Sequence, residues 1–113
     1  MKIYLPIPPS SNMIFRTTKG KRYKTTNYND WLRDGSIFLL QQKIPTLNIK
    51  RANIELYVPK LRANSDIDNR IKPVLDLLVK CNVILDDRYI DSIYAKWIDK
   101  NSDCYVEIKD YKC

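Results

Sequence analysis

Acidic residues gather in one part of the chain, where they could bind a metal ion. Six of the 13 Asp and Glu residues lie between positions 66 and 91, namely Asp66, Asp68, Asp76, Asp86, Asp87 and Asp91. Lys72 follows Asp68 by four residues, so the two would share one face of a helix. Carboxylates that lie close together repel one another unless a cation neutralises them. Because oxygen ligands select hard ions, the pattern indicates a Mg²⁺ or Mn²⁺ site.

Such a site could hydrolyse a phosphodiester, because a bound metal polarises the phosphate and activates a water for in-line attack. Lys72 could then neutralise the charge that develops on the phosphate oxygens. A purely structural alternative is open, since Asp favours helix N-termini and Asp68 with Lys72 can form a plain surface pair. The segment does not fit an EF-hand calcium loop that starts at Asp66, because Ile71 and Leu77 stand where that loop needs Gly and Glu. Spacing assigns no role to Asp76, Asp86 or Asp91.

Positive charge is concentrated at the other end of the chain. The 113 residues carry 20 Lys and Arg and a net charge of +7, yet residues 1–29 hold six basic residues and no acid. A basic segment on a nearly neutral body points to a polyanion, with nucleic acid first and an anionic membrane second. The candidate DNA-binding residues interleave basic and aromatic side chains: Phe15, Arg16, Lys19, Lys21, Arg22, Tyr23 and Lys24. A solvated hairpin, or a charge excess that only aids solubility, is the alternative interpretation.

Composition removes several other classes of site. The chain has no His, and its three Cys residues form no C-x-x-C pair, which argues against zinc sites and Ser-His or Cys-His nucleophiles. A length of 113 residues suits a single domain. No apolar run approaches the roughly 20 residues of a membrane span, and no signal-peptide pattern opens the chain. We therefore expect a cytoplasmic protein with no membrane partner.

Elements that would position these residues follow from periodicity. Alternating polar and apolar residues predict strands at residues 2–7, 52–58, 90–98 and 104–109, and the last two are expected to pair as a hairpin. Helical spacing predicts helices from Thr26 or Asn27 to about Lys43, and over residues 66–80. Residues 15–25 suggest a basic hairpin or an ordered loop. The order favours an α+β fold, a two-layer sandwich with a small mixed sheet and helices on one face.

Two details refine the second helix. Pro73 would interrupt helical hydrogen bonds, so the regular helix is expected to begin near it, with residues 66–72 as an irregular first turn. Asn82 stands where the chain leaves the helix, and Asn tolerates the left-handed conformation needed there.

Residues 66–78 (DIDNRIKPVLDLL), residues 83–87 (VILDD) and Ile90 resemble the central signature of the RusA family of Holliday junction resolvases. Residues 8–12 (PPSSN), Phe15-Arg16 and residues 20–23 (GKRY) are similar to that family's opening segment, in the same order. The similarity spans about residues 3–96. Asn82 departs from the family, whose members commonly carry Gly there.

This resemblance implies a Mg²⁺-dependent endodeoxyribonuclease, bacterial or phage-encoded, that acts as a homodimer on four-way DNA junctions in recombination and repair. It places the essential carboxylates, which are also the metal ligands, at Asp66, Asp68 and Asp87. It places the essential lysine at Lys72. A C2 dimer would supply the two symmetric cuts that resolution requires. The alternative function is a non-catalytic basic nucleic-acid-binding module, or a dimeric regulator that acts through protein contacts alone.

Overall fold

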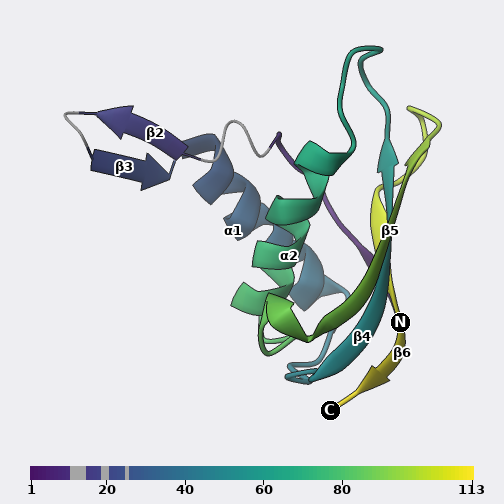
Figure 1. Ribbon diagram of the computed structural model, residues 1–113. Coiled ribbons are helices and arrows are strands. Elements are labelled where there is room, and N and C mark those ends of the chain that lie inside the picture. The colour runs from purple at the N-terminus through teal and green to yellow at the C-terminus, as the bar shows by residue number, and fades with distance from the viewer. Residues whose placement is uncertain (11–14, 19–20, 25) are drawn as a thin grey trace.

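The computed structural model describes residues 1–10, 15–18, 21–24 and 26–113 (Figure 1). Its elements are strands, α-helices and short 3₁₀ helices. Their bounds are β1 (Lys2–Tyr4), β2 (Phe15–Thr18), β3 (Lys21–Lys24), α1 (Thr26–Gln41), β4 (Arg51–Pro59), the short 3₁₀ helix η2 (Asp68–Arg70), α2 (Ile71–Lys80), the 3₁₀ helix η3 (Asp87–Tyr89), β5 (Ile90–Ile98) and β6 (Tyr105–Lys112).

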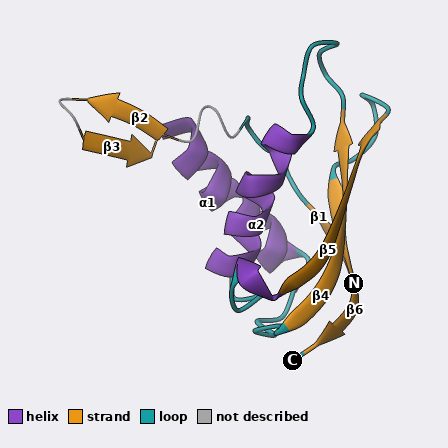
Figure 2. Ribbon diagram, viewed as in Figure 1, coloured by secondary structure: helices purple, strands orange, loops and turns teal. Residues whose placement is uncertain are grey.

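Four strands form one mixed sheet in the order β1-β6-β4-β5. Strand β4 pairs in parallel with β5 and antiparallel with β6, which in turn pairs antiparallel with β1. Both helices lie against the same face of this sheet (Figure 2). The predicted two-layer α+β fold with a small mixed sheet is therefore confirmed.

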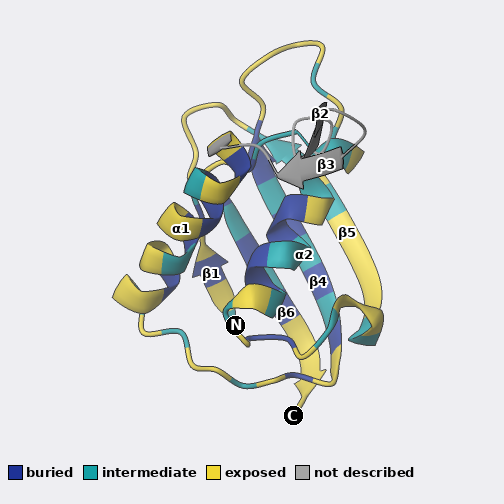
Figure 3. Ribbon diagram, turned by 90° about the vertical axis from the view of Figure 1, so that its left-hand side faces the viewer, coloured by how far each residue is buried: buried dark blue, intermediate teal, exposed yellow. Residues whose placement is uncertain are grey.

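The predicted hairpin between the last two strands is wrong. Strand β6 lies between β1 and β4, while β5 is at the edge of the sheet and pairs with β4. Val106 and Ile108 of β6 are fully buried, whereas Ile93 and Tyr94 of β5 are 42% and 52% exposed (Figure 3). Strand β6 takes the central place, with strands on both sides of it, and its Val106 and Ile108 point into the core. The parallel pairing of β5 follows from its connection to β4 through α2, since parallel neighbours need such a crossover.

Several elements end at other residues than the periodicity predicts. Strand β1 stops at Tyr4 instead of residue 7, because Pro6 has no N–H to donate to a neighbouring strand. Helix α1 ends at Gln41, and β6 continues to Lys112. The basic hairpin is confirmed as the antiparallel pair β2–β3, which extends away from the sheet near the start of α1 (Figure 1).

Helix α2 begins at Ile71, directly after η2. Pro73 is therefore the third residue of the helix, where its missing N–H removes no intrahelical bond. Asn82 has a φ of 58°, which confirms the left-handed conformation predicted for the chain's exit from the helix. No helix in the described part of the chain is long and apolar enough to cross a membrane.

The two helices approach each other closely at Gly35. A Cβ atom on Gly35 would lie 2.6 Å from Cδ2 of Leu77, which is fully buried on α2. This contact explains a glycine inside a helix, where it otherwise costs stability. Trp31 is buried on α1, and its Nε1 donates a hydrogen bond to the carbonyl of Pro6 at 3.1 Å. Trp31 is thus a core residue.

The core predicts a loss of stability at alkaline pH. Cys104 is buried in the core, and this burial raises the pKa of its thiol to about 12, whereas a thiol in the unfolded chain titrates near 8.5. The stabilisation that comes from keeping this thiol protonated is therefore fully present below about pH 8.5 and is lost as the pH rises toward 12. At pH 10 the free energy of unfolding should be lower by about 2 kcal/mol for this reason. Thermal unfolding of Cys104→Ala should show a smaller loss of stability between pH 8 and pH 10 than the natural chain. Cys113→Ala, at an exposed cysteine, is the control; equal losses in all three proteins would contradict the prediction.

Candidate functional site

Helix α2 carries Lys72 and Asp76, and the other candidate acids lie at its two ends. Asp68 begins η2 directly before α2, while Asp87 begins η3 after it. A ten-residue helix is about 15 Å long. Figure 1 shows the segment after α2 beside the far end of the helix, away from η2. The chain therefore presents two acidic regions, one at each end of α2.

A cavity of about 600 Å³ lies between α1, α2 and the segment that leads to η3, and we call it the α2 pocket. Its lining includes Tyr28, Leu32, Lys72, Asp76, Asp86 and Asp87. Asp76 connects its two walls. Oδ2 of Asp76 accepts a hydrogen bond from the Tyr28 hydroxyl, and Oδ1 accepts one from Lys72 Nζ at 2.8 Å. Asp76 thus ties Lys72 on one helix to Tyr28 on the other.

The position of Lys72 favours its charged form. Its hydrogen bond to Asp76 raises the pKa of the ammonium, and the negative charges of Asp76 and Asp87 raise it further. Its side chain is 53% exposed. The predicted helical neighbour Asp68 is not its ion-pair partner; that partner is Asp76, one turn further along α2. Lys72 is therefore a fixed positive charge at the edge of the α2 pocket.

Tyr28 is fully buried, and burial is the main reason why the pKa of its hydroxyl is well above its usual value. The hydrogen bond and the negative charge of Asp76 act in the same direction. Tyr28 consequently stays protonated at neutral pH and remains a hydrogen-bond donor to Asp76. Its place in the core limits where the Asp76 carboxylate can lie.

Asp86 and Asp87 also line the α2 pocket. Asp86 caps η3, because its Oδ1 accepts a hydrogen bond from the backbone N–H of Arg88 at 3.2 Å. This bond is the main cause that lowers the pKa of Asp86, and a hydrogen bond with Asp87 contributes. Asp86 therefore has a structural role as the cap of η3. Asp87 is the first residue of η3, and it is exposed.

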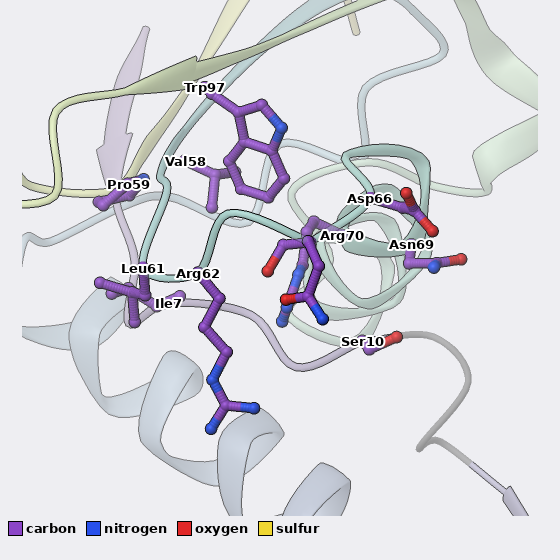
Figure 4. A pocket seen from close by; sticks show the side chains of 12 residues that line it. Ile7, Ser10, Val58, Pro59, Leu61, Arg62, Asp66, Asn69, Arg70 and Trp97 are labelled. Atoms are coloured by element: carbon purple, nitrogen blue, oxygen red, sulfur yellow. The ribbon is translucent and has the colours of Figure 1, made fainter.

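Asp66 and Asp68 lie apart from this group. Asp66 lines a second cavity, the loop pocket, between the loop after β4, η2 and residues 7–10 (Figure 4). Asp68 is exposed on η2 and lines neither cavity. The carboxylates of Asp66 and Asp68 form no hydrogen bond or ion pair with any described residue. They are thus uncommitted oxygen donors.

The donor chemistry of Asp66, Asp68 and Asp87 suits a hard divalent cation, because all three are carboxylates. Their arrangement is less complete. Within residues 1–10, 15–18, 21–24 and 26–113, no three acidic, Cys or His side chains lie close enough together to hold a metal ion. The α2 pocket thus brings Lys72, Asp76, Asp86 and Asp87 together, whereas Asp66 and Asp68 precede α2 and do not line that pocket.

The predicted DNA-binding residues lie on the β2–β3 hairpin, apart from Lys19, which is outside the described residues. The strand register places an aromatic residue opposite a basic one in two consecutive pairs, Phe15 with Lys24 and Arg16 with Tyr23. Thr17 pairs with Arg22 and Thr18 with Lys21. The hairpin backbone therefore holds the basic and aromatic positions in one short ribbon that projects from the domain (Figure 2).

Sequence reasoning missed some residues of these pockets. Tyr28 and Asp76 connect the two helices of the α2 pocket, and only the i, i+4 spacing of Lys72 and Asp76 hinted at part of this link. Trp97 is expected to be a core or sheet-packing residue. It does pack partly against the core, yet it also lines the loop pocket beside Asp66.

The sequence was compared with known proteins. A family model described as Endodeoxyribonuclease RusA matches residues 6–109 of the 113-residue chain. The match includes the β2–β3 hairpin, α2, both pockets, strands β4 and β5 and most of β6. A search of curated proteins found no match to this sequence.

Proposed function

Because the chain belongs to the RusA family of endodeoxyribonucleases, which act on Holliday junctions, we propose that it resolves four-way DNA junctions by metal-dependent, paired symmetric cleavage. The observation that carries the proposal is the family match over residues 6–109, which includes the acidic residues and the lysine around α2. The basic hairpin supports the DNA partner. The reaction would serve DNA recombination and repair.

We propose that Asp66, Asp68 and Asp87 supply the metal ligands, because carboxylates are the donors that Mg²⁺ prefers, with Mn²⁺ as a substitute. Since η2 and η3 lie at opposite ends of α2, binding of one ion by all three would require these two segments to move toward each other. When bound, the ion would polarise the phosphodiester and lower the pKa of a water. Asp66 and Asp68 are free to take this role, because no described residue engages their side chains.

Lys72 is the second part of the proposed catalytic group. Its ammonium stays positive through its contact with Asp76. A fixed cation beside the scissile phosphate would stabilise the negative charge that grows on the phosphate oxygens during hydrolysis. Asp76 and Tyr28 are positioning residues here, since they hold Lys72 from α1 and α2 and need not touch the substrate.

We also propose that the active protein is a homodimer. One chain supplies one set of candidate ligands, whereas resolution needs two symmetric cuts, and a two-fold axis would relate two such sets. Light scattering at micromolar concentration should give twice the 13.4 kDa mass of the chain. A mass of one chain at that concentration would contradict the dimer.

The direct test of function is cleavage of a synthetic four-way junction. The protein should cut two opposing strands of the junction in the presence of Mg²⁺, should be inactive after chelation with EDTA, and should leave a linear duplex of the same sequence intact. Restoring Mg²⁺ to the chelated sample controls for loss of the protein. Tight junction binding without cleavage in any divalent ion would instead favour the non-catalytic binding module that the basic hairpin alone would support.

A further inference from the structure

The loop pocket has a volume of about 540 Å³, within the range of pockets that hold small ligands. Its walls come from the end of β4, the end of β5, the loop after β4, η2 and residues 7–10. No function is yet attached to most of its residues. Figure 4 shows the side chains of Trp97, Arg62 and Asp66 around one hollow.

One side of the loop pocket is apolar. Val58 is buried, Trp97 is half-buried, and Ile7 and Leu61 are 40% and 60% exposed. A flat ring can gain contact area from such a wall, and an indole face can stack on it. A small hydrated ion would gain nothing there.

The other side of the loop pocket is positively charged. Arg62 is exposed, and Arg70 donates from Nη1 to the carbonyl of Pro8 at 2.7 Å. Nε of Arg70 is buried and bonds to no described residue, and no described carboxylate lies within ion-pair distance of this guanidinium. Two arginines against the single acid Asp66 make the pocket cationic. A pocket with an aromatic wall and two guanidinium groups fits a flat ring that carries phosphate, as in a nucleotide.

The place of the pocket decides between a free nucleotide and a nucleotide within DNA. Asp66 lines the pocket and is separated from Asp68 by one residue. A nucleotide in the pocket would therefore lie next to the proposed hydrolytic group. That position suits a nucleotide of the strand being cut.

We propose that the loop pocket binds one unstacked nucleotide of the cleaved strand, with its base against Trp97 and its phosphate near Arg62 and Arg70. This inference rests on the proposed function and adds to it a contact that selects the position of the cut. Unstacking a base inside a continuous duplex has a free-energy cost. The pocket would consequently favour nucleotides at the crossover, where continuous stacking is broken.

The test is a cycle that combines protein variants with abasic sites. Abasic nucleotides are placed one at a time along the strand that is cut, and junction affinity is measured without Mg²⁺ so that cleavage does not interfere. At one position, loss of the base should weaken binding of the natural chain by at least about fivefold. Trp97→Leu should weaken binding to the intact junction by a similar factor, and the abasic site should then cost this variant nothing more.

Matched variants separate this effect from general damage. Tyr94→Leu removes an exposed aromatic from the same strand outside the loop pocket, so it should stay sensitive to the abasic site. Arg62→Gln changes an exposed side chain and should fold even if Trp97→Leu does not; Arg33→Gln on α1 is its control. Arg62→Gln should weaken junction binding several-fold more than Arg33→Gln.

Two results would overturn the proposal. One is that abasic sites lower the junction affinity of the natural chain and of Trp97→Leu by the same factor at every position. The other is that Arg62→Gln and Arg33→Gln bind the intact junction with equal affinity. The cleavage assay on the intact junction is run in parallel. If the natural chain cuts the junction while the cycle is additive, the pocket inference fails and the proposed function stands. If it never cuts, the proposed function itself fails.

Discussion

Asp68→Asn is expected to slow junction cleavage by at least about 100-fold while junction affinity stays equal or increases. A bound metal contributes several kcal/mol to the stabilisation of a phosphoryl transition state, and each 1.4 kcal/mol corresponds to tenfold in rate. Asn keeps the shape of Asp but loses the negative charge that attracts the ion. Removal of one negative charge near the phosphates also lowers repulsion of the DNA.

The structure indicates that this substitution will not unfold the protein. Asp68 is exposed on η2, and its side chain makes no hydrogen bond or ion pair with any described residue. The free energy of unfolding of the variant should therefore lie within about 0.5 kcal/mol of that of the natural chain, which is typical of surface substitutions. Single-turnover cleavage and junction binding are measured in parallel on both proteins.

Asp103→Asn is the matched control, because it removes the same charge from an exposed turn after β5. It should cleave at the rate of the natural chain. Cleavage by Asp68→Asn at that same rate would show that Asp68 is not a ligand. The acids at the helix N-terminus would then have only the structural role that their propensity allows.

Local patterns predicted most of the secondary structure because they depend on neighbouring residues. The apolar spacing within α2, the tolerance of Pro73 near a helix start and the left-handed turn at Asn82 are all properties of short segments. The strand β5 was predicted with the bounds that it has, Ile90–Ile98. Its partner was not, because alternation along a strand says nothing about which edge it pairs with. The pairing follows from the crossover through α2 and from the burial of β6.

The same distinction applies to the candidate site. The acids and Lys72 were predicted from their spacing and from a resemblance to a family. The bond between Tyr28 and Asp76 joins residues 48 positions apart, and it exists because Gly35 lets α1 approach α2. The loop pocket likewise gathers Ile7, Asp66 and Trp97 from three distant segments. No local signal marks such contacts, since they depend on how the layers pack.

Junction binding is expected to weaken by about 500-fold when monovalent salt is raised from about 50 to 200 mM. Each phosphate that a basic side chain neutralises lowers the logarithm of the affinity by about 0.9 per tenfold salt. Residues 15–24, which include strands β2 and β3, carry five basic residues. Five phosphate contacts would give a slope of about −4.5, and a fourfold rise in salt then corresponds to this factor.

The effect should belong to the hairpin and not to the net charge of the chain. Replacing its five basic residues by Gln lowers the net charge from +7 to +2 and should nearly abolish the salt dependence; the changed residues are Arg16, Lys19, Lys21, Arg22 and Lys24. A control variant makes the same change in net charge at five exposed lysines elsewhere, which are Lys43, Lys50, Lys96, Lys100 and Lys112.

The control should keep a slope near that of the natural chain, because condensed counterions are displaced only where the protein contacts the phosphates. Equal loss of slope in both variants would mean that the charge acts through the field of the whole protein. That result would remove the hairpin as a DNA contact while leaving the acids around α2 as the candidate hydrolytic group. The hairpin extends away from the sheet (Figure 1), so its ribbon can meet a DNA arm that the sheet itself does not touch.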